Sequence, residues 1–412
     1  MESLNSLLQK TKIASKELAK LSEEKKNEAL IKIADNLLVN ADYIISENNK
    51  DLENGVKNGL SNAMIDRLRL TIDRLTSISN DIKKVASLDS VIGEVIETYN
   101  RPNGLVIRKV RVPFGVICAI FESRPNVSVD IACLSLKTSN ACILRGGKEA
   151  INSNIALVKV MKESIKDIVN PDSITLIEDT DRRLVTELIE AKEYVDLVVP
   201  RGGKALIQNI VMNSKVPFIE TGAGNCHLYI NKDCDVEMAI KIAVNAKVSR
   251  PAVCNAIETI LVDDEIKEEI LKRIKEEFDK YNVVIKGCNK TKEVIKCEEA
   301  TEEDFFTEYD DYVVSIKVVS DVNEAIKHID KYSTKHSETI VSNNKEAVEK
   351  FLNEVDSSCV YVNASTRFTD GGEFGFGAEL GISTQKLHAR GPMGLREMTT
   401  YKYKIYGEGQ VR

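Results

Sequence analysis

The stretch Gly115-Val-Ile-Cys-Ala-Ile120 contains only apolar residues and glycine, which is typical of a strand buried on both faces of a sheet. Four further apolar runs follow it: ACIL (141–144), ITLI (174–177), VDLVV (195–199) and PFI (217–219). Segments with helical spacing begin near residues 127, 148, 181 and 204. This alternation of strands and helices from Val112 onward predicts an α/β fold with a parallel sheet.

The same alternation returns in the second half of the chain. A helical segment at 235–248 precedes the strand-like run IETILV (257–262), and a charged helix is expected at 265–278. Three more strand-like runs follow: VVSIKVV (313–319), ETIVS (338–342) and CVYVN (359–363). A second parallel-sheet domain is therefore expected.

The first 88 residues have helical character instead. Apolar residues recur at i, i+3, i+4, i+7 and i+8 in the set Leu30, Ile33, Ala34, Leu37 and Leu38. Helices with such a stripe need a surface to cover, and we expect these to pack on the first α/β domain.

A hairpin is expected between these helices and the first sheet. Residues 91–112, VIGEVIETYNRPNGLVIRKVRV, contain two β-rich runs joined by Asn100-Arg-Pro-Asn-Gly104. The run TTYKYKIY (399–406) is also strand-like. Residues 91–112 with 396–412 are therefore expected to form a β oligomerisation element, and the protein to be a homodimer or homotetramer.

Composition excludes several classes of function. The formal net charge of the 412 residues is −7, without a basic stripe, so nucleic-acid binding is not expected. No run of about 18 apolar residues occurs and the N-terminus is polar, which predicts a cytoplasmic protein without membrane segments. The nine cysteines include no CxxC pair, so we expect neither a disulfide framework nor a metal site.

Two similar tetrapeptides follow predicted strands in the first sheet. They are Arg145-Gly-Gly-Lys148 and Arg201-Gly-Gly-Lys204, and a helix begins after each. Glycines let a ligand approach the backbone, and a helix N-terminus offers N–H groups to an anion. Each segment is a candidate phosphate cradle, with an ordinary glycine turn as the alternative. No GxGxxG or GxxxxGK[ST] motif is present, so a nucleotide would bind by another geometry.

Cys254 lies in a different setting from the other cysteines. It belongs to the small-residue loop in Lys247-Val-Ser-Arg-Pro-Ala-Val-Cys-Asn-Ala-Ile-Glu258, between an amphipathic helix and an apolar strand. Its neighbours Ala252 and Asn255 are expected to leave room for a substrate. A buried structural thiol is the alternative for a cysteine without such surroundings.

Several segments together resemble the aldehyde dehydrogenase superfamily. They are Arg124-Pro-Asn126, Glu220-Thr-Gly-Ala-Gly224, Cys254 and Glu308-Tyr-Asp-Asp311. Three segments resemble one branch of this superfamily, the γ-glutamyl phosphate reductases, in their detailed sequence. They are PFIETGAGNCH, SRPAVCNAIETILV and the glycine-rich tail 364–395. The likeness extends from the N-terminal helices to TTYKY near the C-terminus.

The resemblance implies NADPH-dependent reduction of γ-glutamyl phosphate to glutamate-5-semialdehyde and phosphate, the second step of proline biosynthesis. Cys254 would displace phosphate, and the resulting thioester would accept hydride. The side-chain amide of Asn126 and the backbone N–H of Cys254 would stabilise the oxyanion. Glu220 matches the glutamate that activates water in hydrolytic relatives; taking the Cys254 proton, contacting the nicotinamide or holding the turn are other roles open to it.

The implied fold is aldehyde-dehydrogenase-like, with two parallel-sheet α/β domains plus a β-hairpin oligomerisation arm. Residues 1–90 and 113–228 would form the NADP-binding domain, and residues 229–395 the catalytic domain. Arg145 and Lys148 correspond to the segment that contacts the adenosine ribose of the cofactor in related proteins. Two cations there favour binding of the 2′-phosphate of NADP. The second cradle, Arg201, Gly202, Gly203 and Lys204, is expected near the pyrophosphate. Glu308 would hold the nicotinamide ribose, with a solvated carboxylate as the alternative.

The substrate carries anionic groups at both ends, and guanidinium binds carboxylate or phosphate through a fork of N–H groups. The candidate substrate-binding residues are Arg124, Ser365, Thr366, Arg367, His388 and Arg390. Which anion each arginine binds stays open. Functional coupling to glutamate 5-kinase is a further hypothesis.

Two other functions compete with this one. The first is a hydrolytic NAD(P)-dependent aldehyde dehydrogenase, in which Glu220 would activate water to cleave the thioester. The second is a non-catalytic α/β scaffold that assembles through the 91–112 hairpin. A scaffold leaves Cys254, Asn126 and both phosphate cradles unexplained.

Overall fold

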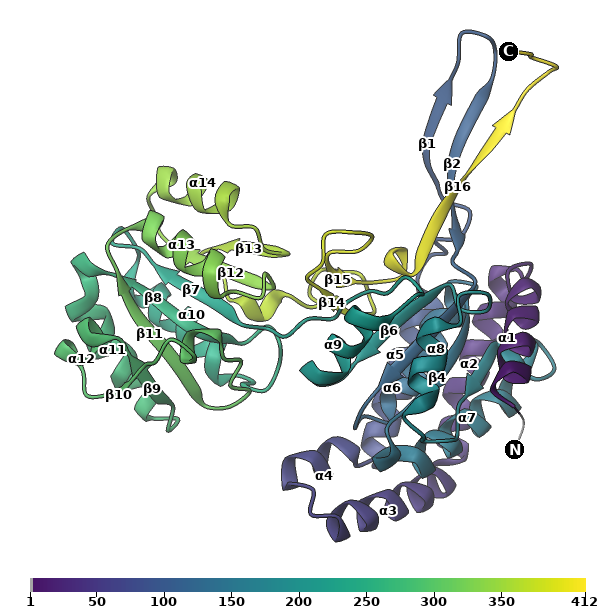
Figure 1. Ribbon diagram of the computed structural model, residues 1–412, viewed down its shortest axis with the longest axis horizontal. Coiled ribbons are helices and arrows are strands. Elements are labelled where there is room, and N and C mark those ends of the chain that lie inside the picture. Colours follow the sequence, from purple (N-terminus) through teal and green to yellow (C-terminus); the bar gives the residue numbers. More distant parts are fainter. Residues whose placement is uncertain (1–2) are drawn as a thin grey trace. The chain divides into compact units, whose positions relative to one another are not determined.

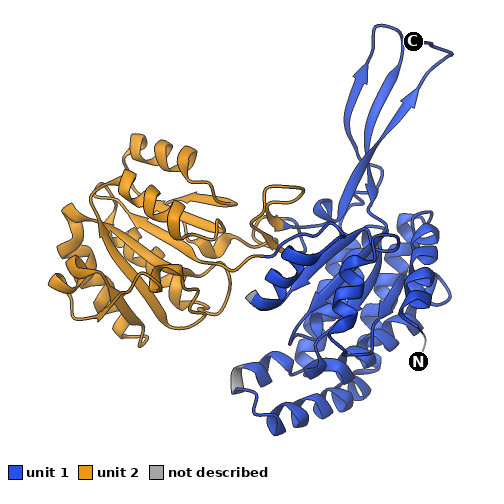
Figure 2. Cartoon of the chain, viewed as in Figure 1, with its two compact units in different colours: residues 1–221, 376–380, 393–412 blue, residues 222–375, 381–392 orange. Residues whose placement is uncertain are grey.

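The structure is a computed structural model that describes residues 3–412, without the side chains of residues 62, 63 and 204 (Figure 1). The chain divides into two compact units (Figure 2). Unit 1 comprises residues 1–221, 376–380 and 393–412, and unit 2 comprises residues 222–375 and 381–392. Among residues 3–412, no helix combines the length and apolar character that crossing a membrane requires.

Unit 1 contains a parallel sheet in the order β5-β4-β3-β6. Its strands are β3 (Val116–Phe121), β4 (Ala141–Arg145), β5 (Ile174–Leu176) and β6 (Leu197–Arg201). The helices that alternate with them are α6 (Asn126–Lys137), α7 (Ile151–Ile165), α8 (Arg183–Glu190) and α9 (Lys204–Asn213). Every residue of β3 is buried, as the apolar run that begins at Gly115 predicts.

One predicted strand of this sheet is wrong. The run at 217–219 forms only an isolated bridge, in which Phe218 pairs with Val198 of β6. Pro217 has no N–H to donate, so its contribution to the pairing is its carbonyl, which accepts from Val198 N at 2.8 Å.

Five N-terminal helices complete unit 1: α1 (Leu4–Leu18), α2 (Glu23–Val39), α3 (Ala41–Lys57), α4 (Asn62–Leu68) and α5 (Ile72–Ser87). Hydroxyl side chains cap four of them, namely Ser3, Ser22, Ser61 and Thr71. Helix α2 packs against α5, α6 and α7, and its Leu30, Ile33 and Leu37 are fully buried. The apolar stripe therefore marks the buried face of the helix.

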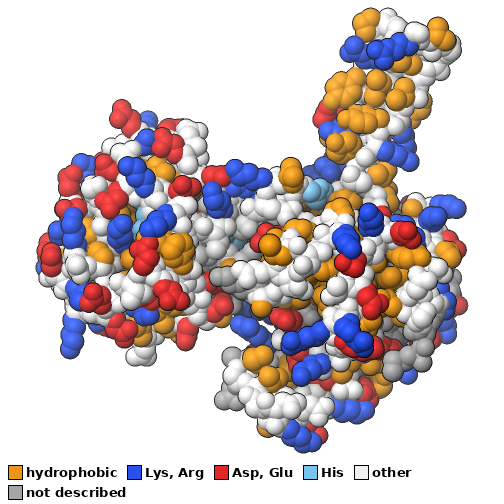
Figure 3. All heavy atoms as spheres, viewed as in Figure 1, with side chains coloured by type: hydrophobic (Ala, Val, Ile, Leu, Met, Phe, Trp, Pro, Cys, Tyr) orange, Lys and Arg blue, Asp and Glu red, His pale blue; other side chains and the backbone are white. Residues whose placement is uncertain are grey.

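The predicted hairpin is confirmed. Strands β1 (Val95–Asn100) and β2 (Val106–Pro113) pair antiparallel, and the C-terminal strand β16 (Thr399–Tyr406) pairs with the other edge of β2. Gly104 in the turn has φ of 89°, a left-handed conformation that favours glycine. We call this three-stranded sheet the arm. Large apolar side chains gather on it (Figure 3) and include Tyr99, Tyr401, Tyr403 and Ile405, all at least 42% exposed.

Unit 2 contains a seven-stranded parallel sheet in the order β10-β9-β11-β8-β7-β12-β13. The strands are β7 (Cys226–Ile230), β8 (Ile257–Asp263), β9 (Val284–Gly287), β10 (Glu298–Glu299), β11 (Val313–Val319), β12 (Ser337–Val341) and β13 (Cys359–Val362). The helices are α10 (Val236–Val248), α11 (Lys267–Asp279), α12 (Asn289–Val294), α13 (Val322–Tyr332) and α14 (Lys345–Glu354). The glycine-rich tail adds two short strands, β14 (Gly381–Ser383) and β15 (Gly391–Met393).

Candidate active site

In unit 1, three predicted site segments follow neighbouring strands of one parallel sheet. Residues 124–126 follow β3, residues 145–148 end β4, and residues 201–204 end β6. Strand β3 pairs with both neighbours, and its Ile120 lies opposite Arg145 while Phe121 lies opposite Arg201. The carboxyl ends of these strands therefore bring the three segments to the same edge of the sheet, where ligands bind in α/β folds.

Asn126 is the first residue of α6, and its amide is oriented by the same helix. Its Nδ2 donates to Asp130 Oδ2 at 3.0 Å, one helical turn later. Burial raises the pKa of Asp130 to about 6, while Asn126 and Arg201 lower it. Because Nδ2 carries two N–H groups, this bond leaves one N–H for an oxyanion.

Arg145 is buried rather than presented to solvent. Its Nη1 donates to Gly146 O at 3.0 Å, and its Nη2 donates to Thr180 O at 2.7 Å. Burial lowers the pKa of this guanidinium. Arg145 therefore holds the backbone of two loops together, and Lys148 is the exposed cation of its segment.

The second tetrapeptide lies at the start of α9. Gly202 and Gly203 are exposed, and Gly203 N donates to Glu122 Oε2 at 2.9 Å. A Cβ on Gly202 would lie 2.5 Å from the same carboxylate oxygen, so a larger residue there would displace the Glu122 side chain. The side chain of Lys204 lies outside the described residues. An anion is therefore already held at this helix N-terminus, in the form of a carboxylate.

In unit 2, Cys254 lies in the turn that leads from α10 into the amino end of β8, and its side chain is half-buried. A Cβ on Gly224 would lie 1.6 Å from Cys254 O, so glycine is required for this contact. The Sγ atom of Cys226 donates to the same carbonyl at 3.1 Å. The residues at the start of β7 therefore contact the Cys254 turn and fix its position.

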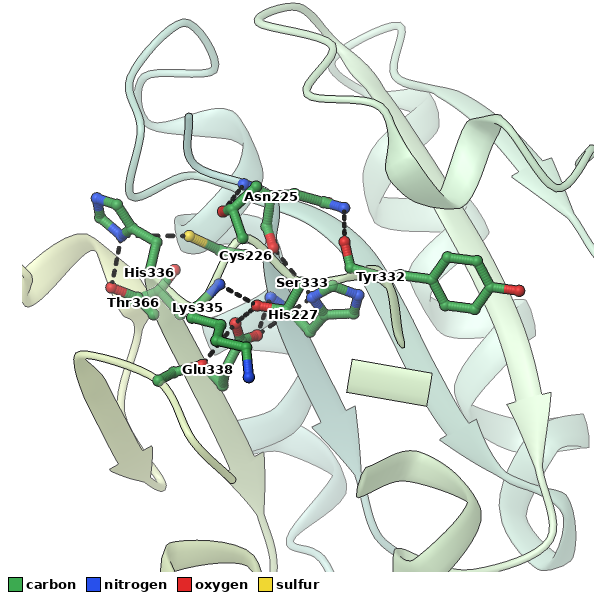
Figure 4. A network of polar contacts seen from close by, with 12 residues as sticks. Asn225, Cys226, His227, Tyr332, Ser333, Lys335, His336, Glu338 and Thr366 are labelled. Atoms are coloured by element: carbon green, nitrogen blue, oxygen red, sulfur yellow. Dashed lines mark hydrogen bonds and ion pairs between the residues drawn. The ribbon is translucent and has the colours of Figure 1, made fainter. Parts of the chain in front are cut away.

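A network of buried polar groups surrounds Cys226 (Figure 4). His336 Nδ1 lies 3.6 Å from Cys226 Sγ and 2.8 Å from Ser337 Oγ. Burial lowers the pKa of His336 to about 4, so this imidazole is neutral at pH 7. Nearby, Glu338 Oε2 accepts from His227 N at 2.7 Å. These contacts join the amino ends of β7 and β12 beneath the Cys254 turn.

Glu308 is half-buried and belongs to the same region of unit 2. Its Oε1 accepts from Gly224 N at 2.7 Å, and burial raises its pKa. The acidic segment around it is not a fully solvated loop, because Asp304 and Phe305 are buried. Glu220 lies half-buried near the end of unit 1.

The turn that contains Ser365, Thr366 and Arg367 contacts the Cys254 loop. Thr366 Oγ1 donates to Asn255 O at 2.7 Å, and Arg367 Nε donates to Ser249 Oγ at 3.2 Å. Burial lowers the pKa of Arg367, and the charge of Arg250 lowers it further. The structure thus brings two predicted substrate residues, Thr366 and Arg367, to the ends of the loop that carries Cys254.

Two other predicted substrate residues lie later in the tail. Arg390 Nη2 forms an ion pair with Asp356 Oδ1 at 2.8 Å, and Lys386 Nζ lies 2.7 Å from Asp356 Oδ2. These two cations hold the pKa of Asp356 well below its usual range. His388 is exposed with φ of 64°, and Arg124 is exposed in unit 1. Arg390 therefore fastens the tail to unit 2.

Sequence reasoning missed three polar residues that support these sites: Asp130, Cys226 and Asn255. The i, i+4 spacing from Asn126 to Asp130 on an expected helix was a usable signal. No local pattern connects Cys226 with Cys254. Asn255 is expected from the sequence only to leave room for a substrate; the structure shows in addition that it is 5% exposed and bonded to the tail. Among the described side chains, no group of three or more His, Cys, Asp or Glu could hold a metal.

Comparisons with known proteins point to one family. The aldehyde dehydrogenase family model matches residues 1–295. A γ-glutamyl phosphate reductase of Clostridium perfringens is 53% identical over 98% of both chains, and one of Caldicellulosiruptor bescii is 52% identical over 100% of both.

Solved structures give the same result. The crystal structure of γ-glutamyl phosphate reductase from Thermotoga maritima matches with a TM-score of 0.98 at 46% identity, covering 100% of both chains. An acetylating aldehyde dehydrogenase from Geobacillus thermoglucosidasius, with a TM-score of 0.72 at 16% identity over 99% of this chain and 97% of that one, shares the fold. The chain therefore belongs to the aldehyde dehydrogenase family and, within it, to the γ-glutamyl phosphate reductases.

Proposed function

We propose that this chain reduces γ-glutamyl phosphate to glutamate-5-semialdehyde with NADPH and releases phosphate, as the second step of proline biosynthesis. The observation that carries the proposal is the full-length similarity to proteins named γ-glutamyl phosphate reductase. The placement of Cys254 in a turn held by Gly224 and Cys226 supports it, because covalent catalysis needs a positioned thiol.

The covalent chemistry is assigned to Cys254. Its thiolate attacks the acyl carbon, the tetrahedral oxyanion collapses, and phosphate leaves with the electron pair of the bond that breaks. The resulting thioester receives hydride at its carbonyl carbon, which is the chemistry that a bound NADPH supplies. The thiohemiacetal then collapses to the aldehyde and regenerates the thiolate. The backbone N–H of Cys254 and the side-chain amide of Asn126 are the proposed oxyanion donors.

A nicotinamide dinucleotide fits the carboxyl edge of the unit 1 sheet. The pyrophosphate is assigned to Gly202 and Gly203 at the start of α9, where it would replace the Glu122 carboxylate that Gly203 N binds. Arg201 and Lys204 are the cations assigned to it. Lys148 is the exposed cation proposed for the 2′-phosphate of NADP, and Arg145 shapes the loops around it. Glu308 is the proposed partner of the nicotinamide ribose.

Anionic groups of the substrate are assigned to arginines. Arg367 uses two of its five N–H groups on Ser249 and Asn255, so three stay available for an anion. Ser365 and Thr366 belong to the same turn, and Arg124 is the candidate in unit 1. His388 and Arg390 stay candidates, with Arg390 already paired to Asp356. Glu220 is proposed to act on the Cys254 proton or to hold its turn.

Assembly and location belong to the same proposal. The exposed apolar residues of the arm support a homodimer or homotetramer formed through it. A cytoplasmic location and functional coupling to glutamate 5-kinase fit a biosynthetic enzyme whose substrate decays in water.

The test uses the reverse reaction, because the acyl phosphate decays in water. Reduction of NADP is followed by absorbance with and without phosphate, for wild type, Cys254→Ala and the matched control Cys234→Ala. Cys234 is a half-buried thiol of the same unit, located beyond the opposite end of β7.

Turnover that requires phosphate and Cys254, but not Cys234, is the expected result. Turnover without phosphate would mean that water cleaves the thioester and would make the protein a hydrolytic aldehyde dehydrogenase. In that case Glu220 would be the base that activates water.

A further inference from the structure

Asn255, the residue after Cys254, forms hydrogen bonds with one turn of the glycine-rich tail. Its Nδ2 donates to Thr369 O at 2.8 Å and to Arg367 O at 3.4 Å. Its Oδ1 accepts from Arg367 Nη1, and its backbone carbonyl accepts from Thr366 Oγ1 at 2.7 Å. The side chain is 5% exposed, so water does not compete for these groups.

The Arg367 side chain also connects the turn at 365–369 with the Cys254 loop. Its Nε donates to Ser249 Oγ at the end of α10, and its Nη1 donates to Asn255 before β8. One guanidinium therefore bridges the two ends of the loop that contains Cys254.

The turn is also anchored to the sheet. Thr369 Oγ1 lies 2.6 Å from Ser337 Oγ of β12 and 2.7 Å from Tyr361 OH of β13. The turn at 365–369 is thus bonded both to the Cys254 loop and to strands β12 and β13.

We propose that Asn255 is a positioning residue that fixes the Arg367 guanidinium relative to the Cys254 thiol. The inference rests on the proposed function, in which Arg367 binds an anionic group of the substrate and Cys254 attacks the acyl carbon. Asn255 suits this task because its amide presents a donor and an acceptor in one plane, and both are used on the same turn. A substrate bound by Arg367 then has its acyl carbon held at one place with respect to the sulfur.

The experiment combines two single variants in a double-mutant cycle. Phosphate-dependent oxidation of glutamate-5-semialdehyde is measured for wild type, Asn255→Ala, Arg367→Ala and the double variant. We expect Asn255→Ala to lower kcat/KM by about a hundred-fold, the scale of a misplaced reacting group, and to raise KM. Because Asn255 acts through Arg367, the double variant should lose no more than the worse single variant.

Asn231 provides a matched control for stability. It is also 5% exposed and belongs to unit 2, at the opposite end of β7 from Cys226. Its Nδ2 donates to Tyr229 OH at 3.0 Å, and its Oδ1 accepts from Ser342 Oγ at 2.8 Å. Asn231→Ala should lower the urea midpoint to a similar extent as Asn255→Ala and keep the wild-type KM.

Four outcomes decide the question. Additive losses in the double variant, or wild-type kinetics in Asn255→Ala, would overturn the inference and leave the proposed function standing. A wild-type enzyme without phosphate-dependent turnover would overturn the proposed function and this inference with it. If Asn255→Ala does not fold, Arg367→Lys keeps a cation at this position but removes the planar fork that bonds Ser249 and Asn255 together; a wild-type KM and kcat in that variant would also overturn the inference.

Discussion

The Nζ atom of Lys247 lies 2.6 Å from Glu258 Oε2, and the two side chains are 0% and 1% exposed. Lys247 belongs to the last turn of α10, and Glu258 is the second residue of β8, so the ion pair joins the two elements on either side of the Cys254 loop. The ring of Tyr309 lies 6.0 Å from the same Nζ atom. The pair therefore fixes the base of the loop within the core of unit 2.

Removing one partner of this pair should be strongly destabilising. Lys247→Met leaves the Glu258 carboxylate buried without its cation, and we expect a loss of about 3–5 kcal/mol, seen as a lower urea midpoint. The double variant Lys247→Met/Glu258→Leu should recover most of the loss, because both charges are then removed. The exposed pair Lys272 and Glu268 is the matched control, and Lys272→Met should cost less than about 1 kcal/mol. Equal effects of Lys247→Met and Lys272→Met would contradict this prediction.

Asp130 should make the stability of unit 1 depend on pH. Burial raises its folded-state pKa from 3.8 to about 6, so between these values the folded protein holds a proton that the unfolded chain has lost. Stability therefore falls as pH rises through this window, and above it the loss due to this group stays constant. Asp130→Asn removes the titrating group. The melting temperature of the variant minus that of wild type should therefore increase from about pH 4 to about pH 6 and stay constant above that. A difference in melting temperature that is the same at every pH would show that burial does not shift the pKa of this carboxyl group.

Gly224→Ala should displace the Cys254 turn. The new methyl group would lie 1.6 Å from Cys254 O, and backbone must move to make room. We expect kcat to fall by more than about ten-fold because the thiol is moved. Gly222→Ala is the control in the same segment, since its methyl group would meet the Thr384 side chain, which can rotate away. Assays of phosphate-dependent turnover should therefore show a smaller loss for Gly222→Ala, and equal losses would contradict the argument.

One face of the arm should mediate assembly. Tyr401, Tyr403 and Ile405 alternate along β16 with Lys402 and Lys404, so the three apolar residues share a face. Ile405→Glu places a charge on that face and should lower the mass measured by sedimentation toward that of the monomer. Lys404→Glu, on the other face, should keep the wild-type mass. An Ile405→Glu variant that sediments like wild type would exclude this face as the interface.

Local patterns predicted most of the fold. The hairpin at 91–112, the buried strand after Gly115 and the strand after Cys254 are all present. Each depends on side-chain alternation, apolar runs or turn residues, which act over a few neighbouring positions. The run at 217–219 makes only a bridge to Val198, and Pro217 at its start has no N–H to donate to a ladder.

The order of the elements, the family and the turn that carries Cys254 can be predicted from local sequence patterns. Which polar groups of the candidate site already have partners depends on how the chain folds. Arg145 bonds Thr180 across 35 residues, Asn255 bonds Thr369 across 114, and Arg390 pairs with Asp356 across 34. Periodicity and spacing report on neighbours along the chain, whereas these partners meet only when the chain folds.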